Sequence, residues 1–336
     1  MMKKNNICFA HFAVLGLSMF ALMGCQKKSS EAPAETNAAA VESSVAPASC
    51  PGVAPSGDLV ADRIPGANTT LTEPGLYEGP VWINGMLYFS DFTFASGFPS
   101  RIQRLDAHGE LATVINDSGS NGLAVDAQGN IIAGTHKFKG ISRYNIASSE
   151  RTTVVDHFNG NVFNSPNDVT VATDGTIYFT DPSFQRDAAP GGQDKTAVYR
   201  VATDGTVTVV DDSMSNPNGI SLSPAGDVLY VAGGGEQGVL RAYPIVNGVP
   251  QAGKDLVTGV TVPDGMAVDC LGNIYVTEHT SQRLRVFTPA GKQIATIKVD
   301  ANVTNAAFGG ALGKTLFISG AGAIWKLELD VTGSPY

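Results

Sequence analysis

One phrase recurs six times along this 336-residue chain, at intervals of 43, 46, 51, 46 and 41 residues. Each copy opens with an acidic or amide residue, continues as an apolar run, turns, and ends in a second run rich in Ile, Tyr, Phe and Val. The opening residues are Glu78, Asn121, Asn167, Asn218, Asp264 and Asn305. Hairpin repeats of this length are typical of propeller blades. The sequence therefore predicts an all-β fold, a six-bladed β-propeller.

A second set of hairpins lies between the repeats. Three clear examples are 101–106 with 111–115, 197–201 with 206–210, and 283–287 with 294–298. Each unit therefore supplies the four strands of one blade. We expect the last blade to take its third strand from 323–329 and its fourth from 58–71, so that strands from both ends of the chain close the ring and leave few exposed edges.

The first 24 residues have the features of a secretory signal: a short basic head, then an apolar stretch too short to be read as a membrane span. The stretch ends in Leu-Met-Gly-Cys25, which resembles the bacterial lipobox and implies cleavage before Cys25 and lipidation of its thiol. The alternative is an ordinary signal peptide with an incidental cysteine. Gln26 follows, where Asp would have resembled an inner-membrane retention signal, so we expect an outer-membrane lipoprotein facing the periplasm.

Residues 25–57 are rich in Ala, Ser, Pro and Glu, a composition that cannot bury enough apolar surface to fold. We expect a lipidated cysteine and flexible tether there, followed by a propeller catalytic domain over 58–336. The formal charge is −9, and it would become −11 once Lys3 and Lys4 leave with the signal, because residues 1–24 contain no acid. A surface so acidic, without a basic cluster, excludes nucleic acid as an expected partner.

Two of the four cysteines remain once the signal is removed and Cys25 is lipidated. These are Cys50, in the tether, and Cys270, in a hairpin turn expected at the channel end opposite the repeated acidic and amide residues. In an oxidising periplasm they could form a disulfide that pins the tether, or they could remain two unpaired thiols. Neither thiol is expected to be a nucleophile, because neither lies near the expected channel mouth.

The residues that open the repeats should meet at one place. The inner strands of a propeller surround a common axis, so their first residues lie at the mouth of the central channel. Four oxygen-bearing side chains would converge there: Glu78, Asn167, Asn218 and Asp264. Ca²⁺ prefers six to eight oxygen ligands, and an incomplete protein shell leaves positions for water and substrate. Asn305 is left out of this set, because its copy lacks the Gly that usually follows.

Several stretches of the chain resemble the gluconolactonase, senescence-marker-protein and luciferin-regenerating-enzyme family. They are Glu78-Gly-Pro-Val-Trp, Phe163-Asn-Ser-Pro-Asn-Asp-Val, Ile177-Tyr-Phe-Thr-Asp-Pro, Pro217-Asn-Gly-Ile and Pro263-Asp-Gly-Met. The resemblance spans about 75–320, and paraoxonases and diisopropyl fluorophosphatase are more distant relatives by fold and metal plan. It implies a hydrolase that opens small sugar-type lactones with one divalent cation, usually Ca²⁺ and sometimes Zn²⁺ or Mn²⁺. Glu78, Asn167, Asn218 and Asp264 would be the metal ligands.

The chemistry suggests roles for the remaining residues at the mouth. A cation that polarises the lactone carbonyl stabilises the oxyanion formed when water attacks. Asp264 is the candidate general base, although metal ligation lowers the pKa of a carboxylate and the two roles compete. Asn121 and His136 are expected to bind substrate. His136 could equally be a surface residue on a blade loop, and His279 has a similar setting with a weaker claim.

Departures from the family pattern leave the substrate class open. The family continues Gly-Asn-Arg-Arg after the second strand of the second blade, whereas this chain has Lys137-Phe-Lys-Gly. The family's basic residues are suited to bind a sugar acid or its phosphate, so their replacement leaves the substrate class open. The polar loop 185–194 is expected to be a lid or a specificity loop. An aryl-ester or phosphotriester hydrolase, and a non-enzymatic binding module stiffened by Ca²⁺, remain alternatives. We expect a monomer that contacts the membrane only through its lipid anchor.

Overall fold

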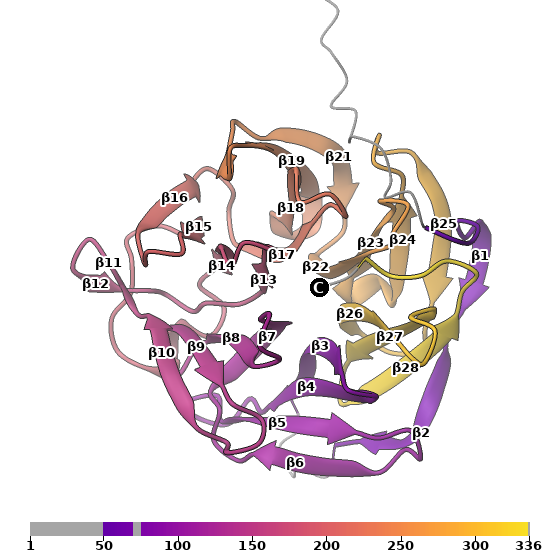
Figure 1. The fold of residues 1–336 in the computed structure, drawn as a ribbon, viewed down its shortest axis with the longest axis horizontal. Helices are drawn as coiled ribbons and strands as arrows, with labels where there is room; N and C mark the ends of the chain where they lie inside the picture. Colours follow the sequence, from indigo (N-terminus) through magenta and orange to yellow (C-terminus); the bar gives the residue numbers. More distant parts are fainter. Residues whose placement is uncertain (1–49, 70–74, 335–336) are drawn as a thin grey trace, which may run out of the picture. The chain divides into compact units, whose positions relative to one another are not determined.

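The computed structural model describes residues 50–69 and 75–334 and shows six blades around a common axis, with an inner strand of each blade nearest the axis (Figure 1). This confirms the predicted six-bladed β-propeller. Cys25 and the signal segment lie outside the described residues.

The first three blades follow one another along the chain. Blade 1 contains β3 (Leu76–Ile83), β4 (Met86–Phe92), β5 (Ser100–Leu105) and β6 (Leu111–Ile115). Blade 2 contains β7 (Ser120–Val125), β8 (Ile131–Thr135), β9 (Gly140–Tyr144) and β10 (Arg151–Val155). Blade 3 contains β13 (Val169–Val171), β14 (Ile177–Asp181), β15 (Ala197–Val201) and β16 (Val207–Asp211).

The last three blades include strands from both ends of the described chain. Blade 4 contains β17 (Pro217–Leu222), β18 (Val228–Gly233), β19 (Gly238–Val246) and β21 (Lys254–Val260). Blade 5 contains β22 (Pro263–Val268), β23 (Ile274–Glu278), β24 (Arg283–Phe287) and β25 (Gln293–Lys298), joined by β1 (Gly57–Val60). Blade 6 contains β26 (Val303–Gly309), β27 (Thr315–Gly320), β28 (Ala323–Glu328) and β2 (Asp62–Asn68).

Only short elements lie outside the blades in the part of the chain that the structure describes. They are the strands β11 (His157–Phe158), β12 (Asn161–Val162) and β20 (Val249–Pro250), and the 3₁₀ helices η1 (Arg186–Ala188), η2 (Gly235–Gln237) and η3 (His279–Ser281). Within the same residues, no helix is long and apolar enough to cross a membrane.

The ring closes as the sequence predicts, with one addition. β2 supplies the fourth strand of blade 6 and pairs with β28, where Asp62 lies opposite Lys326. The strand before it, β1, was not expected: it adds to the outer edge of blade 5 in parallel with β25, with Leu59 opposite Ile297. The N-terminal segment therefore holds two neighbouring blades together.

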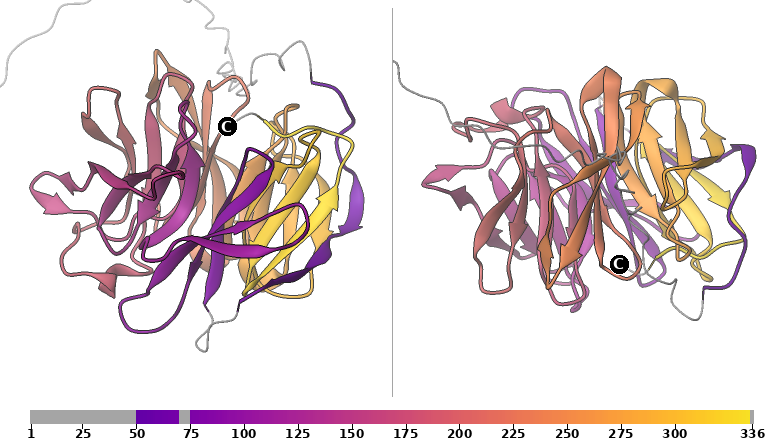
Figure 2. Two further views of the ribbon diagram at one scale, coloured as in Figure 1. Left: turned by 60° about the horizontal axis from the view of Figure 1, so that its bottom comes forward. Right: turned by 90° about the horizontal axis from the view of Figure 1, so that it is seen from above.

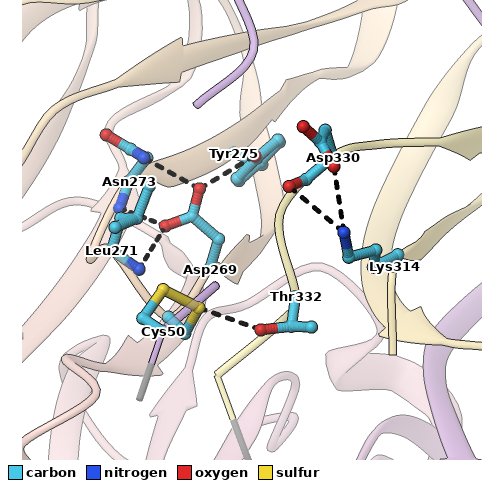
Figure 3. The surroundings of a disulfide bond; sticks show 9 residues. Cys50, Asp269, Leu271, Asn273, Tyr275, Lys314, Asp330 and Thr332 are labelled. Carbon is cyan, nitrogen blue, oxygen red and sulfur yellow. Dashed lines mark hydrogen bonds and ion pairs between the residues drawn. A yellow bond between two sulfur atoms is a disulfide. The ribbon is translucent and has the colours of Figure 1, made fainter. Parts of the chain in front are cut away.

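A disulfide between Cys50 and Cys270 fastens the start of the described chain to blade 5 (Figure 3). Beside it, the backbone N–H of Cys270 donates to the carbonyl of Thr332 at 2.9 Å, and Gly52 pairs with Val331. Of the two alternatives for this cysteine pair, the structure therefore shows the disulfide. The chain is thus attached to the ring at Cys50, before its first strand, β1, begins.

The core lies between adjacent blades. The second strand of each blade carries large apolar side chains on both faces, which explains why these segments read as continuous runs of Ile, Tyr, Phe and Val. Between blades 3 and 4, for example, buried Tyr178 packs in one cluster with Ile220 and Leu229. Full burial of one such side chain stabilises the fold by about 1.5–3 kcal/mol.

The strands of each blade run from one face of the ring to the other (Figure 2), so the loops fall on two opposite faces. We call the face that carries the residues just before the inner strands and just after the second strands the mouth face. The turns between inner and second strands form the opposite face. The two faces therefore receive different residues of every repeat.

Candidate functional site

The inner strands share an irregularity near their first residues. In five blades the pairing with the second strand shifts register there, between Glu78 and Val81, Ser120 and Leu123, Pro217 and Ile220, Pro263 and Met266, and Val303 and Ala306. A β-bulge frees a residue from the ladder and re-aims its side chain. The bulges therefore fall at the repeated acidic and amide residues.

The glycine that follows the repeated residue has a steric reason. A Cβ at Gly219 would lie 2.2 Å from the carbonyl oxygen of Asp264 in the next blade, and one at Gly79 would lie 2.4 Å from the backbone nitrogen of Leu123. Neighbouring inner strands thus approach each other more closely than a side chain would allow. This close packing around the channel explains why a glycine follows the repeated acid or amide residue.

Hydroxyl groups of the second strands tie each blade to the next. Ser90 donates to the carbonyl of Asn121 at 2.5 Å, and Thr180 donates to the carbonyl of Asn218 at 2.6 Å. These bonds satisfy backbone carbonyls that the bulges remove from the ladder. They also fix the backbone of the residues that carry the candidate site.

The four predicted metal ligands are all buried, and each lies within two residues of the start of an inner strand. Their exposed fractions are 3% for Glu78, 4% for Asn167, 7% for Asn218 and 9% for Asp264. The side-chain oxygens of Asn167 and Asn218 have no hydrogen-bond partner, and the same holds for Asn121. A buried polar atom without a partner costs about 1–3 kcal/mol. Three such acceptors on neighbouring blades fit a bound cation or substrate hydroxyl groups.

Two further residues of the site were not assigned from the sequence. Asp168 stands where four other copies have Gly, and it is buried. The Nδ2 of Asn305 donates to Glu78 Oε2 at 3.0 Å and to both carboxylate oxygens of Asp168 at 2.9 Å. Asn305 therefore bridges two acids, a donor role that is consistent with leaving it out of the ligand set. The Asn-Asp pair in place of Asn-Gly was the available signal for Asp168.

Electrostatic repulsion concentrates at this point of the molecule. Burial, together with the charges of Asp264 and Asp168, raises the pKa of Glu78 well above its ordinary value. Burial and the charge of Asp264 likewise raise the pKa of Asp168, while the amide of Asn305 opposes the shift in both acids. A divalent cation would relieve this repulsion.

Carboxylates alone do not form a metal site at the mouth. Among residues 50–69 and 75–334, no three His, Cys, Asp or Glu side chains form a group that could hold a metal ion. A cation at the mouth would therefore depend on asparagine oxygens as well as on acids. That combination of hard oxygen donors suits Ca²⁺.

His279 lies beside Asp264. Its Nδ1–H donates to the carbonyl of Val303 at 2.6 Å and lies 3.4 Å from Asp264 Oδ2. Burial lowers the pKa of His279, but the hydrogen bond and the charge of Asp264 raise it by more, so the net shift is upward. A cationic His279 would orient Asp264 and stabilise its carboxylate. From the sequence, His279 had the weaker claim of the two histidines to bind substrate; the structure places it beside Asp264.

His136 is fully buried, so its interpretation as a surface residue is wrong. Its Nε2 lies 2.7 Å from the carbonyl of Phe98, and a carbonyl only accepts, so Nε2 carries the proton. Its Nδ1 is then a buried acceptor without a partner. Burial lowers the pKa of His136 to about 4, so the ring is neutral near pH 7. Since Thr135 pairs with Ser120, His136 lies at the same end of blade 2 as Asn121.

The loop at 185–194 is held at several points. Gln193 donates through Nε2 to the carbonyls of Phe158, Asn161 and Val162 at 2.8–3.0 Å. The buried Lys139 ammonium donates to the carbonyls of Asn164 and Arg186. These bonds favour a fixed specificity loop over a lid.

Asp181 positions the segment that leads to Asn167. Its two carboxylate oxygens accept the backbone N–H groups of Asn164 and Ser165 at 2.9 and 2.7 Å. Burial raises the pKa of Asp181 to about 7, although the two backbone hydrogen bonds lower it. Asp181 therefore caps the backbone of the segment before Asn167.

A large cavity lies away from these acids. It has a volume of about 780 Å³, opens on the opposite face, and is lined by residues that include Trp82, Arg143 and Asp174. Trp82 is only partly buried there. A cavity of about 70 Å³ within the channel contacts Asp168 and Asn305. The candidate site is therefore defined by its side chains and not by the volume of the cavity beside it.

Comparison with known proteins agrees with this geometry. Residues 76–322 match the family model described as the SMP-30/Gluconolactonase/LRE-like region. The chain is 30% identical over 291 residues to a gluconolactonase of Zymomonas mobilis, covering 76% of this chain and 79% of that protein.

Solved structures show the same fold. A gluconolactonase of Xanthomonas campestris superposes with a TM-score of 0.69 at 27% identity, covering 83% of this chain and 99% of that one. The calcium-binding regucalcin of Agrobacterium tumefaciens superposes with a TM-score of 0.67 at 20% identity, covering 84% and 97%. The family match and the gluconolactonase relatives support lactone hydrolysis. The chain belongs to the SMP-30/gluconolactonase/LRE-like family.

Proposed function

We propose that this protein is a hydrolase that opens small sugar-type lactones and depends on one divalent cation. The observation that carries the proposal is the set of buried amide oxygens without partners on Asn167 and Asn218, next to the buried acids Glu78 and Asp264. These four side chains would hold the cation. The donors are all oxygens, which favours Ca²⁺ over Zn²⁺, a metal usually bound by nitrogen and sulfur, and Mn²⁺ is a further alternative.

The residues of the mouth have distinct roles in this proposal. The chemistry that a bound divalent cation supplies is polarisation of the lactone carbonyl. Asp264 accepts a proton from the attacking water, and His279 holds the Asp264 carboxylate in place. The water oxygen joins the acyl carbon, the ring C–O bond breaks, and the released alkoxide takes up a proton to give a hydroxy acid. Asn121 Oδ1 and His136 Nδ1 are free to accept hydrogen bonds from substrate hydroxyl groups.

A chelation experiment tests this function. The purified full chain would be stripped of metal, and hydrolysis of gluconolactone and related lactones would be followed by pH-stat before and after Ca²⁺, Zn²⁺ or Mn²⁺ is restored. We expect turnover only with metal, and none for Asp264→Ala. Asp126→Asn is the matched control, because Asp126 pairs with Arg143 beside the cavity on the opposite face. If no lactone is hydrolysed with any metal while Ca²⁺ still raises the melting temperature, the lactonase proposal fails and a binding module is favoured. Turnover of aryl esters or phosphotriesters alone would instead indicate a different electrophile.

We also propose that Cys25 is lipidated and anchors a monomeric protein to the periplasmic side of the outer membrane. The support is the Leu-Met-Gly-Cys25 ending of the apolar signal, followed by Gln26. Metabolic labelling with a fatty acid should mark the wild-type chain and not Cys25→Ala. Equal labelling of both chains would contradict the anchor.

A further inference from the structure

The mouth face carries its longest loops over one half of the ring. In blades 1 and 3 the second strand is followed by the long loops 93–99 and 182–196. In blades 4, 5 and 6 the corresponding loops are short, at 234–237, 279–282 and 321–322. His136 donates a hydrogen bond to the carbonyl of Phe98, and Lys139 donates to the carbonyls of Asn164 and Arg186, so these bonds connect the loops of blades 1, 2 and 3. A continuous wall therefore borders one side of the candidate site.

Two exposed phenylalanines occupy matching places on this wall. Phe94 is 57% exposed and Phe184 is 46% exposed. Each lies three residues after an acid near the end of the second strand, Asp91 in β4 and Asp181 in β14. Within the described residues they are the only exposed Phe, Tyr or Trp side chains. Large aromatic side chains left in water on the face that carries a site are available to cover an apolar group.

The same position differs in the other blades. In blade 2 it is Phe138, but the Arg151 guanidinium covers that ring at 3.9 Å. In blades 4, 5 and 6 the position holds Glu236, Ser281 and Ala323. The two open aromatic faces therefore belong to blades 1 and 3, where the loops are long.

Few cations of the wall remain available to an anionic substrate. Lys137 pairs with Asp117 at 2.5 Å, and Lys195 pairs with Asp212 at 2.5 Å. Lys139 donates to backbone carbonyls, as described above. Arg186 bonds only the carbonyl of Gln193 at 3.2 Å, and is the one wall cation described here that lacks an acidic partner or a second hydrogen bond. Lys137 and Lys139, which stand in place of the family's basic pair, are thus already bonded to other groups of the protein.

The charge of the site itself opposes an anion as well. Glu78 and Asp168 both accept hydrogen bonds from the amide of Asn305, and Asp264 is close enough to interact electrostatically with both acids. A divalent cation neutralises at most two of these three acids. A phosphate or carboxylate on the substrate would therefore meet a mouth that is not positively charged.

We propose that the mouth selects uncharged lactones whose ring carries an apolar substituent, and that Phe94 and Phe184 are the specificity-determining residues that contact this substituent. The proposal rests on the lactone hydrolase function above and narrows its substrate class. The metal centre opens the lactone ring, while the two phenylalanines remove the substituent from water.

The test compares three lactones with the purified, Ca²⁺-loaded full chain: an alkyl-substituted δ-lactone such as δ-decalactone, glucono-1,5-lactone and its 6-phosphate. We expect kcat/KM to be highest for the alkyl lactone and lowest for the phosphate. The double variant Phe94→Ser/Phe184→Ser should lose roughly tenfold in kcat/KM for the alkyl lactone, the scale at which one or a few apolar contacts discriminate. Its kcat/KM for gluconolactone should stay within about twofold, which also shows that the variant folds.

Leu312→Ser is the matched control, because Leu312 is 77% exposed on a turn of the opposite face. It should change none of the three rates. Preference for the 6-phosphate, with its rate lost in Arg186→Gln, would overturn the inference and point to an anionic substrate. Equal loss on all three lactones in the double variant would also overturn it, because the phenylalanines would then act on the fold. Absence of turnover on every lactone would instead mark failure of the hydrolase proposal, and this inference would fall with it.

Discussion

Individual residues at the mouth combine features that are costly for folding. Buried carboxylates repel one another, and buried amide oxygens lack donors. Such strain is expected where a ligand supplies what the fold leaves out. The positions of Glu78 and Asp264 followed from repeat alignment alone, because a repeat brings equivalent residues to one place. The bridge made by Asn305 did not, since it depends on a contact between side chains of different blades.

Asp168 offers a test at this scale. Asp168→Asn removes one of three neighbouring charges and keeps an acceptor for the amide of Asn305. We expect the metal-free protein to melt a few degrees higher, because repulsion falls. Its Ca²⁺ affinity should drop by about tenfold or more, because one negative charge beside the cation is lost. Differential scanning calorimetry and calcium titration measure the two effects. Asp126→Asn should change neither the melting temperature nor the calcium affinity in this way. A metal-free Asp168→Asn protein that melts at a lower temperature than the metal-free wild type would contradict the repulsion.

His136 gives a pH-dependent prediction. Its pKa is about 4 in the folded protein and 6.5 ordinarily, so between these values the unfolded chain binds a proton that the folded chain does not. Stability should therefore fall as pH drops from 6.5 to 4, with a contribution from this residue on the order of 3 kcal/mol. In His136→Gln, which keeps a donor for Phe98, melting temperature should fall less over this range. An unchanged slope would show that His136 titrates normally.

Single elements explain why the blades could be predicted and why some details could not. The second strands are long apolar runs with hairpin turns, so their positions followed from the sequence. β1 did not, because four residues such as Gly57–Val60 carry too short a pattern, and their parallel pairing depends on the edge of blade 5. The bulges were also hidden, since they arise from contact between adjacent inner strands.

Gly219 tests the packing of adjacent inner strands. In Gly219→Ala the new Cβ would lie 2.2 Å from the carbonyl oxygen of Asp264, so the inner strands of blades 4 and 5 would have to separate. We expect a loss of about 2–3 kcal/mol in unfolding free energy, together with weaker calcium binding. Gly205→Ala is the control: its Cβ meets no atom within 4 Å, and its φ of +85° costs roughly 1 kcal/mol. Denaturant unfolding would compare them, and equal losses would contradict the close-packing explanation.

At the scale of the whole molecule, the two ends of the described residues, near Cys50 and Thr332, meet on the side away from the site. The Cys50–Cys270 disulfide joins residues 220 apart in the sequence, next to the C-terminal segment around Thr332 (Figure 3). The sequence left this pairing open, because spacing alone cannot bring Cys50 to blade 5. The mouth-face loops are separate from this closure, so stability and catalysis should be separable.

Cys50→Ser/Cys270→Ser tests that separation. Removal of a native disulfide typically costs 2–5 kcal/mol, mainly because the unfolded chain is less constrained. We expect a loss of that size in the unfolding free energy, measured in denaturant under oxidising conditions, with kcat/KM for lactones unchanged below the melting temperature. Wild-type protein in reductant should match the variant. A large loss of activity at unchanged stability would show that closure and site are coupled.

The most direct measurement of the central claim is a calcium titration by isothermal calorimetry of the full chain, wild type beside Asn167→Ala, Asn218→Ala and Asn121→Ala. We expect one Ca²⁺ per wild-type chain. Affinity should be strongly reduced by Asn167→Ala and Asn218→Ala, whose unpartnered oxygens are assigned to the cation, and nearly kept by Asn121→Ala, which is assigned to substrate. No calcium binding by the wild type, or equal affinity in all four proteins, would contradict a metal centre at the mouth of this propeller.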